Sequence, residues 1–233
     1  MKTLSGTLIR RLNARLEEAY GRPPRHKTLR PLDSLIRTIL SQNTNDTNSS
    51  EGFRRLKKAF PTWEQAARAP VSRIASAIKV SGLSNMKAPR IKSALRRVKR
   101  ERDRYSMDFV RRMDPVEAKE YLSSFDGVGP KTAACVLMFA CGKPVFPVDT
   151  HVLRVSKRLG LIGRRKTADQ AHQILGEAVP PDLVYSFHVL LIAHGRQTCR
   201  SRRPACERCV LRRSCDDLRR RMQPKAKPKA RKR

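Results

Sequence analysis

Aromatic residues, acidic residues and long apolar runs are all scarce in this 233-residue chain, and each shortage argues against a class of protein. Aromatic side chains make up 5% of the sequence, which argues against a stacking platform for single-stranded nucleic acid such as an OB-fold or an RRM sheet. The longest uncharged runs, 132–142 and 184–195, are too short to span a bilayer. No apolar signal-peptide core follows the N-terminus, so we expect an intracellular protein with no membrane partner.

The shortage of acidic residues leaves a large positive charge. Lysine and arginine total 52 against 20 aspartate and glutamate, which gives a formal net charge of +32 and a pI near 11.2. This balance predicts a nucleic-acid partner whose binding weakens steeply with salt. With 39% apolar content, the chain can bury one sizeable core or two small ones.

Apolar residues recur at helical spacing along most of the chain, and no convincing strand alternation is present. The stripes at 71–78 and 91–98 follow this spacing, as does a longer one. The longer stripe comprises Leu32, Leu35, Ile36, Ile39 and Leu40. Further helices are expected between Asp149 and Gly160 and between Asp182 and Gly195, each with an N-cap carboxylate and a closing glycine. The predicted fold class is therefore all-α.

The C-terminal segment 219–233 holds nine basic residues, no acidic residue and two prolines. This composition predicts a disordered basic tail. The tail either tethers DNA or only keeps the protein soluble, and composition does not decide between the two.

A short glycine motif, Gly-Val-Gly-Pro-Lys at 127–131, lies between two predicted helices, the first at 115–125. Gly127 and Gly129 can adopt positive φ and let a phosphate approach their amides, while Pro130 suits the first helical position. Such a helix-hairpin-helix unit would grip the DNA backbone without reading sequence. The alternative is a C-cap glycine, a tight turn and a solvated lysine.

Four cysteines near the C-terminus are spaced C-x6-C-x2-C-x5-C: Cys199, Cys206, Cys209 and Cys215. A chain without an export signal is not expected to form a disulfide knot, so the spacing predicts a metal or cluster site. One C-x2-C flanked by longer arms favours an iron–sulfur cluster modestly over zinc, which stays open. Cys135 and Cys141 lie in an apolar helical segment and are interpreted as core cysteines.

Taken together, these motifs resemble the endonuclease III family of helix-hairpin-helix DNA glycosylases. The interval of eighteen residues from Lys131 to Asp149 and the cysteine spacing are both typical of that family. The matching segments are 39–46, 81–85, 122–134, 146–151 and 194–199, the last continuing into the cysteine cluster.

The resemblance implies two helical domains with the active site in the groove between them. A helical barrel would span 33–143 and carry the hairpin at 122–134. A discontinuous domain, 1–32 with 144–218, would hold a [4Fe-4S] cluster on the four cysteines. The resemblance also implies a monomer in the cytoplasm, associated with the nucleoid.

The same resemblance implies a bifunctional base excision repair enzyme that removes oxidised pyrimidines from double-stranded DNA and cleaves abasic sites. Lys131 would attack C1′ as a neutral amine, and the helix N-terminus disfavours its ammonium form. Asp149 would deprotonate the lysine or stabilise positive charge on the sugar; without the family it is interpreted as an N-cap, and it can be both.

Flipping a nucleotide out of the stack requires side chains that fill the gap. In the family a glutamine does so, and alignment leaves Gln42 and Asn43 both open; Leu83 would wedge the opposite strand. Without the family, these would be helix-end polar residues and a leucine tucked into the core. His151 would contact DNA or serve a structural role, and Asp46 is interpreted as a structural cap.

Two other functions compete with this one. A monofunctional adenine- or thymine-mismatch glycosylase would lack the hairpin lysine, and the adenine type has a glutamate near position 38, where this chain has Thr38. A non-enzymatic DNA-binding protein would not need both Lys131 and Asp149.

Overall fold

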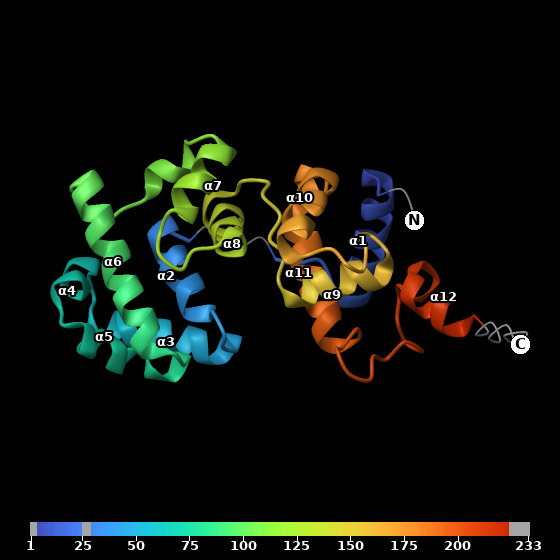
Figure 1. Ribbon diagram of the computed structural model, residues 1–233, viewed down its shortest axis with the longest axis horizontal. Helices are drawn as coiled ribbons and strands as arrows, with labels where there is room; N and C mark the ends of the chain where they lie inside the picture. Colours follow the sequence, from blue (N-terminus) through green and yellow to red (C-terminus); the bar gives the residue numbers. More distant parts are fainter. Residues whose placement is uncertain (1–3, 25–28, 224–233) are drawn as a thin grey trace, which may run out of the picture. The chain divides into compact units, whose positions relative to one another are not determined.

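The computed structural model describes residues 4–24 and 29–223, and these residues are all-α with no strand, which confirms the predicted fold class (Figure 1). The α-helices are α1 (Gly6–Tyr20), α2 (Pro31–Ser41), α3 (Asp46–Ala59), α4 (Trp63–Arg68), α5 (Val71–Ala77), α6 (Ser84–Arg102), α7 (Pro115–Ser123), α8 (Pro130–Cys141), α9 (Thr150–Leu159), α10 (Ala168–Ala178), α11 (Val184–Gln197) and α12 (Asp216–Met222). Short 3-10 helices are η1 (Lys79–Ser81), η2 (Asp108–Arg111), η3 (Pro181–Leu183) and η4 (Arg212–Ser214). Within the described ranges, no helix combines the length and apolar character needed to cross a membrane.

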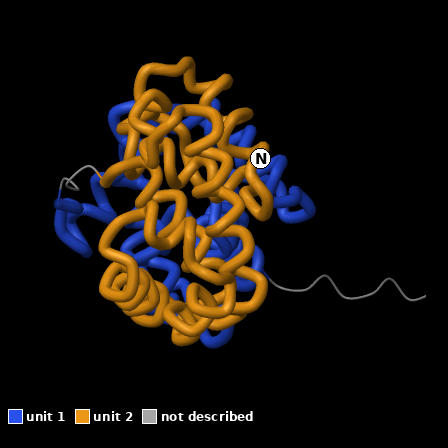
Figure 2. The backbone as a smooth tube through the Cα atoms, turned by 90° about the vertical axis from the view of Figure 1, so that its left-hand side faces the viewer, with its two compact units in different colours: residues 1–24, 148–233 blue, residues 25–147 orange. Residues whose placement is uncertain are grey.

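The chain divides into two compact units, coloured in Figure 2. The central unit is residues 25–147, and the terminal unit joins residues 1–24 to 148–233. The predicted barrel, 33–143, lies within the central unit, whose boundaries extend eight residues further at one end and four at the other. The segments 1–24 and 148–218 are common to the terminal unit and the predicted cluster domain.

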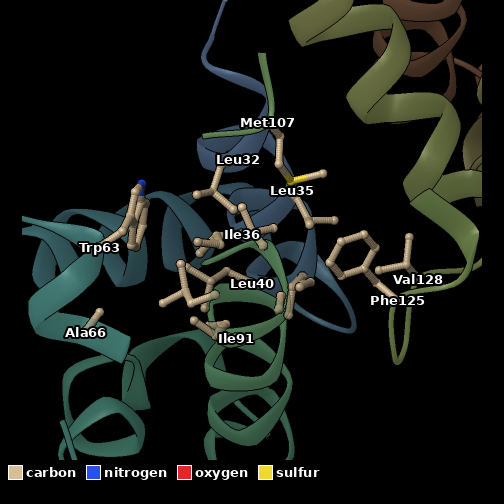
Figure 3. Close-up of a cluster of buried hydrophobic side chains, with 14 of the residues drawn as sticks. Leu32, Leu35, Ile36, Leu40, Trp63, Ala66, Ile91, Met107, Phe125 and Val128 are labelled. Carbon is tan, nitrogen blue, oxygen red and sulfur yellow. The ribbon is translucent and has the colours of Figure 1, made fainter. Parts of the chain in front are cut away.

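The core of the central unit is built around α2. All five residues of the longer predicted stripe in this helix are buried, each with at most 2% of its surface exposed. Figure 3 shows Phe125 and Val128, from the segment after α7, reaching toward Leu35. Burying side chains of this size contributes about 1.5–3 kcal/mol each, so this segment is anchored by hydrophobic contacts.

Helix ends in the terminal unit follow the predicted caps in one case and depart from them in another. Helix α9 begins after Asp149 and ends at Gly160, whose φ is 78°, as predicted. Helix α11 does not close at Gly195 but runs through it, and Asp182 lies in η3 rather than at its cap. A Cβ at position 195 would lie 2.9 Å from the Cβ of His151. This glycine therefore permits close packing of α9 on α11.

The predicted disordered tail, 219–233, begins inside α12, so the prediction is wrong for its first four residues. Arg219 pairs with Asp216 at 2.6 Å and Arg221 pairs with Asp217 at 2.6 Å, at helical spacings of three and four residues. These pairs extend the helix into a basic segment that has no apolar face. Residues 224–233 lie outside the described part of the chain.

Candidate functional site

The hairpin between α7 and α8 takes its shape from a left-handed glycine. Helix α7 ends at Ser123, two residues short of the predicted end, and Gly127 follows with φ 71°. A Cβ at Gly127 would lie 2.6 Å from Arg90 Nε. Glycine is therefore required there by its left-handed backbone conformation, whereas the flexible end of Arg90 can move aside.

The second hairpin glycine does not use the positive φ that glycine permits. Gly129 caps α8 with φ −86° and ψ 179°, so of the two hairpin glycines only Gly127 is left-handed. Nothing lies within 4 Å of a Cβ built on Gly129. Among the described residues, neither Gly127 nor Gly129 donates its amide to a backbone acceptor. These amides at the N-terminal end of α8 are suited to binding an anion.

Lys131 is the second residue of α8 and follows Pro130, which occupies the predicted first helical position. Its side chain is half-buried. In the described part of the chain its ammonium has no hydrogen-bond or ion-pair partner. Lys131 thus follows the hairpin glycine Gly129 by two residues, and no described residue engages its amine.

Asp149 is the N-cap of α9, which confirms the structural half of its interpretation. Its Oδ1 accepts a hydrogen bond of 2.7 Å from the Val152 amide, and the residue is half-buried. A carboxylate has about four acceptor positions, so one cap bond leaves capacity for another partner.

His151 is tied to the protein through one ring nitrogen. Its Nδ1 lies 3.0 Å from Arg154 Nη2, and Arg154 also donates from Nε to the Cys199 carbonyl oxygen at 3.0 Å and from Nη2 to that of Gly195 at 2.9 Å. A contact of His151 with DNA stays a prediction, and it would have to use the other nitrogen.

The loop after α2 separates the roles of the two residues that alignment leaves open. Gln42 donates from Nε2 to the Gly127 carbonyl oxygen at 2.8 Å and to Thr132 Oγ1 at 3.3 Å, so it braces the hairpin. Asn43 is exposed and has a left-handed φ of 52°. Of the two, Asn43 is the exposed side chain, and its insertion into DNA stays a prediction.

The cap of the next helix is not the predicted residue. Asn45 caps α3, and its side chain accepts a hydrogen bond of 2.8 Å from the Asn48 amide. Asp46 is the first helical residue, where a negative charge favours the helix dipole.

Leu83 is exposed, which excludes the alternative of a leucine tucked into the core. It precedes α6 with φ 49°, after Gly82 with φ 65°, and 46% of its surface is accessible. Met86, three residues later, is also 46% exposed. The start of α6 thus presents two apolar side chains to the outside.

The four cysteines of the predicted cluster line one cavity in the terminal unit, together with Arg158 and His194. Within residues 4–24 and 29–223, no three His, Cys, Asp or Glu side chains converge closely enough to hold a single metal ion. A cubane gives each thiolate its own iron and therefore needs the sulfurs further apart. Burial raises the pKa of the Cys209 thiol to about 11, so binding of a metal cluster must release protons.

Two residues beside these thiols were not predicted to have a role. Arg158 Nη1 lies 3.3 Å from the Cys199 sulfur, and His194 Nε2 lies 3.7 Å from the Cys209 sulfur. Burial lowers the pKa of His194 to about 4, so its ring is neutral at neutral pH. The cysteine spacing carries no information about either neighbour, because α9 and α11 bring them in from elsewhere in the chain.

A glycine hairpin that opens a helix with a lysine, in an all-α and strongly basic chain, defines a DNA-binding protein of the helix-hairpin-helix class. Residues 36–181 match the family described as HhH-GPD superfamily base excision DNA repair protein, and the chain belongs to this superfamily.

Known relatives agree with this assignment. The chain is 39% identical over 165 residues to a provisionally named DNA glycosylase of Arabidopsis thaliana, covering 71% of this chain but 56% of that protein's length. It is 34% identical over 193 residues to endonuclease III of Sulfolobus acidocaldarius, covering 81% of this chain and 83% of that one. A solved non-covalent complex of an endonuclease III with DNA matches with a TM-score of 0.79 and 26% identity, over 94% of this chain and 99% of that chain.

Proposed function

We propose that this protein excises oxidised pyrimidines from duplex DNA and cleaves the resulting abasic site, with Lys131 as nucleophile. Its family makes it a base excision repair enzyme, a DNA glycosylase and abasic-site lyase. The observation that carries the proposal is Lys131 itself, an unpaired amine that follows the open hairpin amides by two residues. An amine at that point can either attack C1′ or pair with a phosphate, and borohydride trapping separates the two.

The chemistry needs a neutral amine and a leaving base. The lysine Nζ bonds to C1′ as the bond from C1′ to the base breaks, and the base leaves with the bonding electrons and takes up a proton. Opening of the sugar ring, with a proton taken up by its oxygen, leaves an iminium ion on C1′. Removal of a 2′ proton then expels the 3′ phosphate by β-elimination. Asp149 accepts the proton from the lysine or stabilises positive charge on the sugar.

Insertion of two side chains stabilises the flipped nucleotide. Asn43 fills the gap and Leu83 wedges the opposite strand. Both are exposed and left-handed, which supports this assignment over Gln42, whose amide is bound to the hairpin. We further propose that His151 contacts a DNA phosphate and that the protein acts as a monomer on DNA of the nucleoid.

A panel of duplexes with different damaged bases, each treated with borohydride, tests the proposal. We expect covalent trapping and strand cleavage on abasic-site and thymine-glycol duplexes. Release of a base without an adduct would instead identify a monofunctional glycosylase. DNA binding with neither base release nor nicking would identify a non-enzymatic binding protein.

The four cysteines Cys199, Cys206, Cys209 and Cys215 would hold a [4Fe-4S] cluster. Their common cavity supports this proposal. The cluster, when bound, would cross-link the segments that carry the four cysteines. Arg158 would donate a hydrogen bond to the Cys199 thiolate.

Purified protein is expected to contain about four iron and four sulfide per chain and to show visible absorption. Cys206→Ser should lose the cluster and destabilise the terminal unit. Cys141→Ser, which changes a cysteine on α8 outside the cavity, is the matched control and should keep it. A colourless protein with one bound zinc would refute the cluster.

Deletion of residues 224–233 tests the tether interpretation of the tail, which lies outside the described residues. The deletion removes six basic residues. If these contact phosphates, the slope of log affinity against log salt becomes shallower by up to about 5. The single-turnover rate at saturating protein should change little. An unchanged salt slope would mean that the tail does not bind DNA.

A further inference from the structure

Lys87, on the second turn of α6, is a buried cation in a protein whose other basic residues mostly face solvent. Only 1% of its surface is exposed, and burial lowers its pKa. Its Nζ donates to the carbonyl oxygen of Leu40 at 2.8 Å and to that of Ser81 at 2.7 Å. No acidic partner pairs with it among the described residues. Burying an ammonium is costly, so these two bonds are its compensation.

The two carbonyls belong to the ends of two different elements. Leu40 lies in the last turn of α2, and Ser81 is the last residue of η1. Carbonyls at helix ends have no partner within the helix and carry the negative end of its dipole. A single ammonium therefore satisfies one carbonyl at each end and links the two ends.

Each of these ends leads, within two residues, into a loop residue with left-handed backbone, which is strained at Leu83. Asn43 follows α2 with φ 52°, and Leu83 follows η1 with φ 49°. Left-handed backbone is unfavourable for residues other than glycine, asparagine and aspartate, and it persists where the surroundings enforce it. The clamp made by Lys87 lies within three residues of both side chains.

We propose that Lys87 is a positioning residue that sets the spacing between Asn43 and Leu83, so that both enter the same opened base pair. This rests on the proposed function, in which those two side chains insert into DNA. Lys87 touches neither substrate nor reacting atoms and acts only through the two loops. A misplacement of about 1 Å in such a constellation can lower a rate by two orders of magnitude.

Other contacts hold the rest of the region when Lys87 is changed. Ser81 Oγ donates to the Asn48 carbonyl oxygen at 3.3 Å, and Gln42 ties its loop to the hairpin at Gly127. A Cβ on Gly52 would collide with the Ser81 hydroxyl, so α3 packs directly on η1. Loss of the ammonium should therefore disturb the loop spacing while the central unit stays folded.

The test compares Lys87→Met, which keeps the volume and removes the donors, with Leu95→Ala, which weakens the same helix two turns away. Lys87→Gln serves as a second variant if Lys87→Met fails to fold. The first readout is fluorescence of 2-aminopurine placed opposite a tetrahydrofuran analogue of an abasic site. This analogue has no electrophilic C1′, so the fluorescence reports insertion without chemistry. The second is lyase cleavage of an abasic site in duplex and in single-stranded DNA, because a single strand has no opposite base to wedge.

With Lys87→Met we expect the fluorescence change to disappear and the duplex cleavage rate to fall at least about tenfold, with single-strand cleavage within about twofold of wild type. Leu95→Ala should alter neither readout. Equal fluorescence in wild type and Lys87→Met, or no response in wild type, would overturn the proposal. Wild type that responds but cuts neither substrate would reject the proposed chemistry and leave the positioning role supported.

Discussion

Lys131→Met is expected to eliminate the borohydride-trapped adduct and to lower both base excision and strand cleavage by about three orders of magnitude or more. Methionine has nearly the length of the lysine side chain but no nucleophile, so no bond to C1′ can form. The hairpin is unaffected, because its shape depends on Gly127 and on the buried anchors Phe125 and Val128. Single-turnover assays on abasic and thymine-glycol duplexes measure the effect.

Lys119→Met is the matched control for this prediction. Lys119 is exposed on α7, in the same helix-hairpin-helix unit, and its substitution makes the same change of charge. Both variants should bind undamaged duplex with nearly the affinity of wild type, since each removes one positive charge of many. Trapping that persists in Lys131→Met at the wild-type level would assign the Schiff base to another amine.

Local signals in the sequence predicted much of this fold. The apolar stripe of α2 depends on helical periodicity. The ends of α9 depend on the side chain of Asp149, which caps the helix, and on Gly160, which permits left-handed backbone. Gly195 shows where such signals fail. A glycine that allows close helix packing has the same sequence signature as one that ends a helix, and only the neighbour, His151, distinguishes them.

In the candidate site too, the sequence points to some residues and gives no sign of others. Lys131, Asp149 and the cysteines are candidates that the sequence alone proposes, because chemistry restricts both residue type and spacing. The role of Lys87 could not be predicted. Leu40 is remote from it in sequence, and both Leu40 and Ser81 contribute only a backbone oxygen. Backbone acceptors are the same for every residue type, so the sequence contains no trace of such a contact.

Two substitutions of Asp149 separate its role as a helix cap from the role of its negative charge. Asp149→Asn retains an oxygen that can accept the hydrogen bond from the Val152 amide, and asparagine is as good an N-cap as aspartate. Asp149→Ala removes cap and charge together and should cost about 1 kcal/mol of stability. If the carboxylate serves the chemistry, both variants should lose activity by about 10²- to 10³-fold, whereas only the alanine variant is destabilised.

Asp114 provides the control, because it caps α7 through a hydrogen bond of 2.7 Å from the Val116 amide. Asp114→Asn and Asp114→Ala make the same two changes at a cap with no proposed chemical role. They should reproduce the difference in thermal unfolding without the loss in single-turnover rate. An Asp149→Asn variant with wild-type activity would reduce Asp149 to a helix cap, since the one property it lacks is the negative charge.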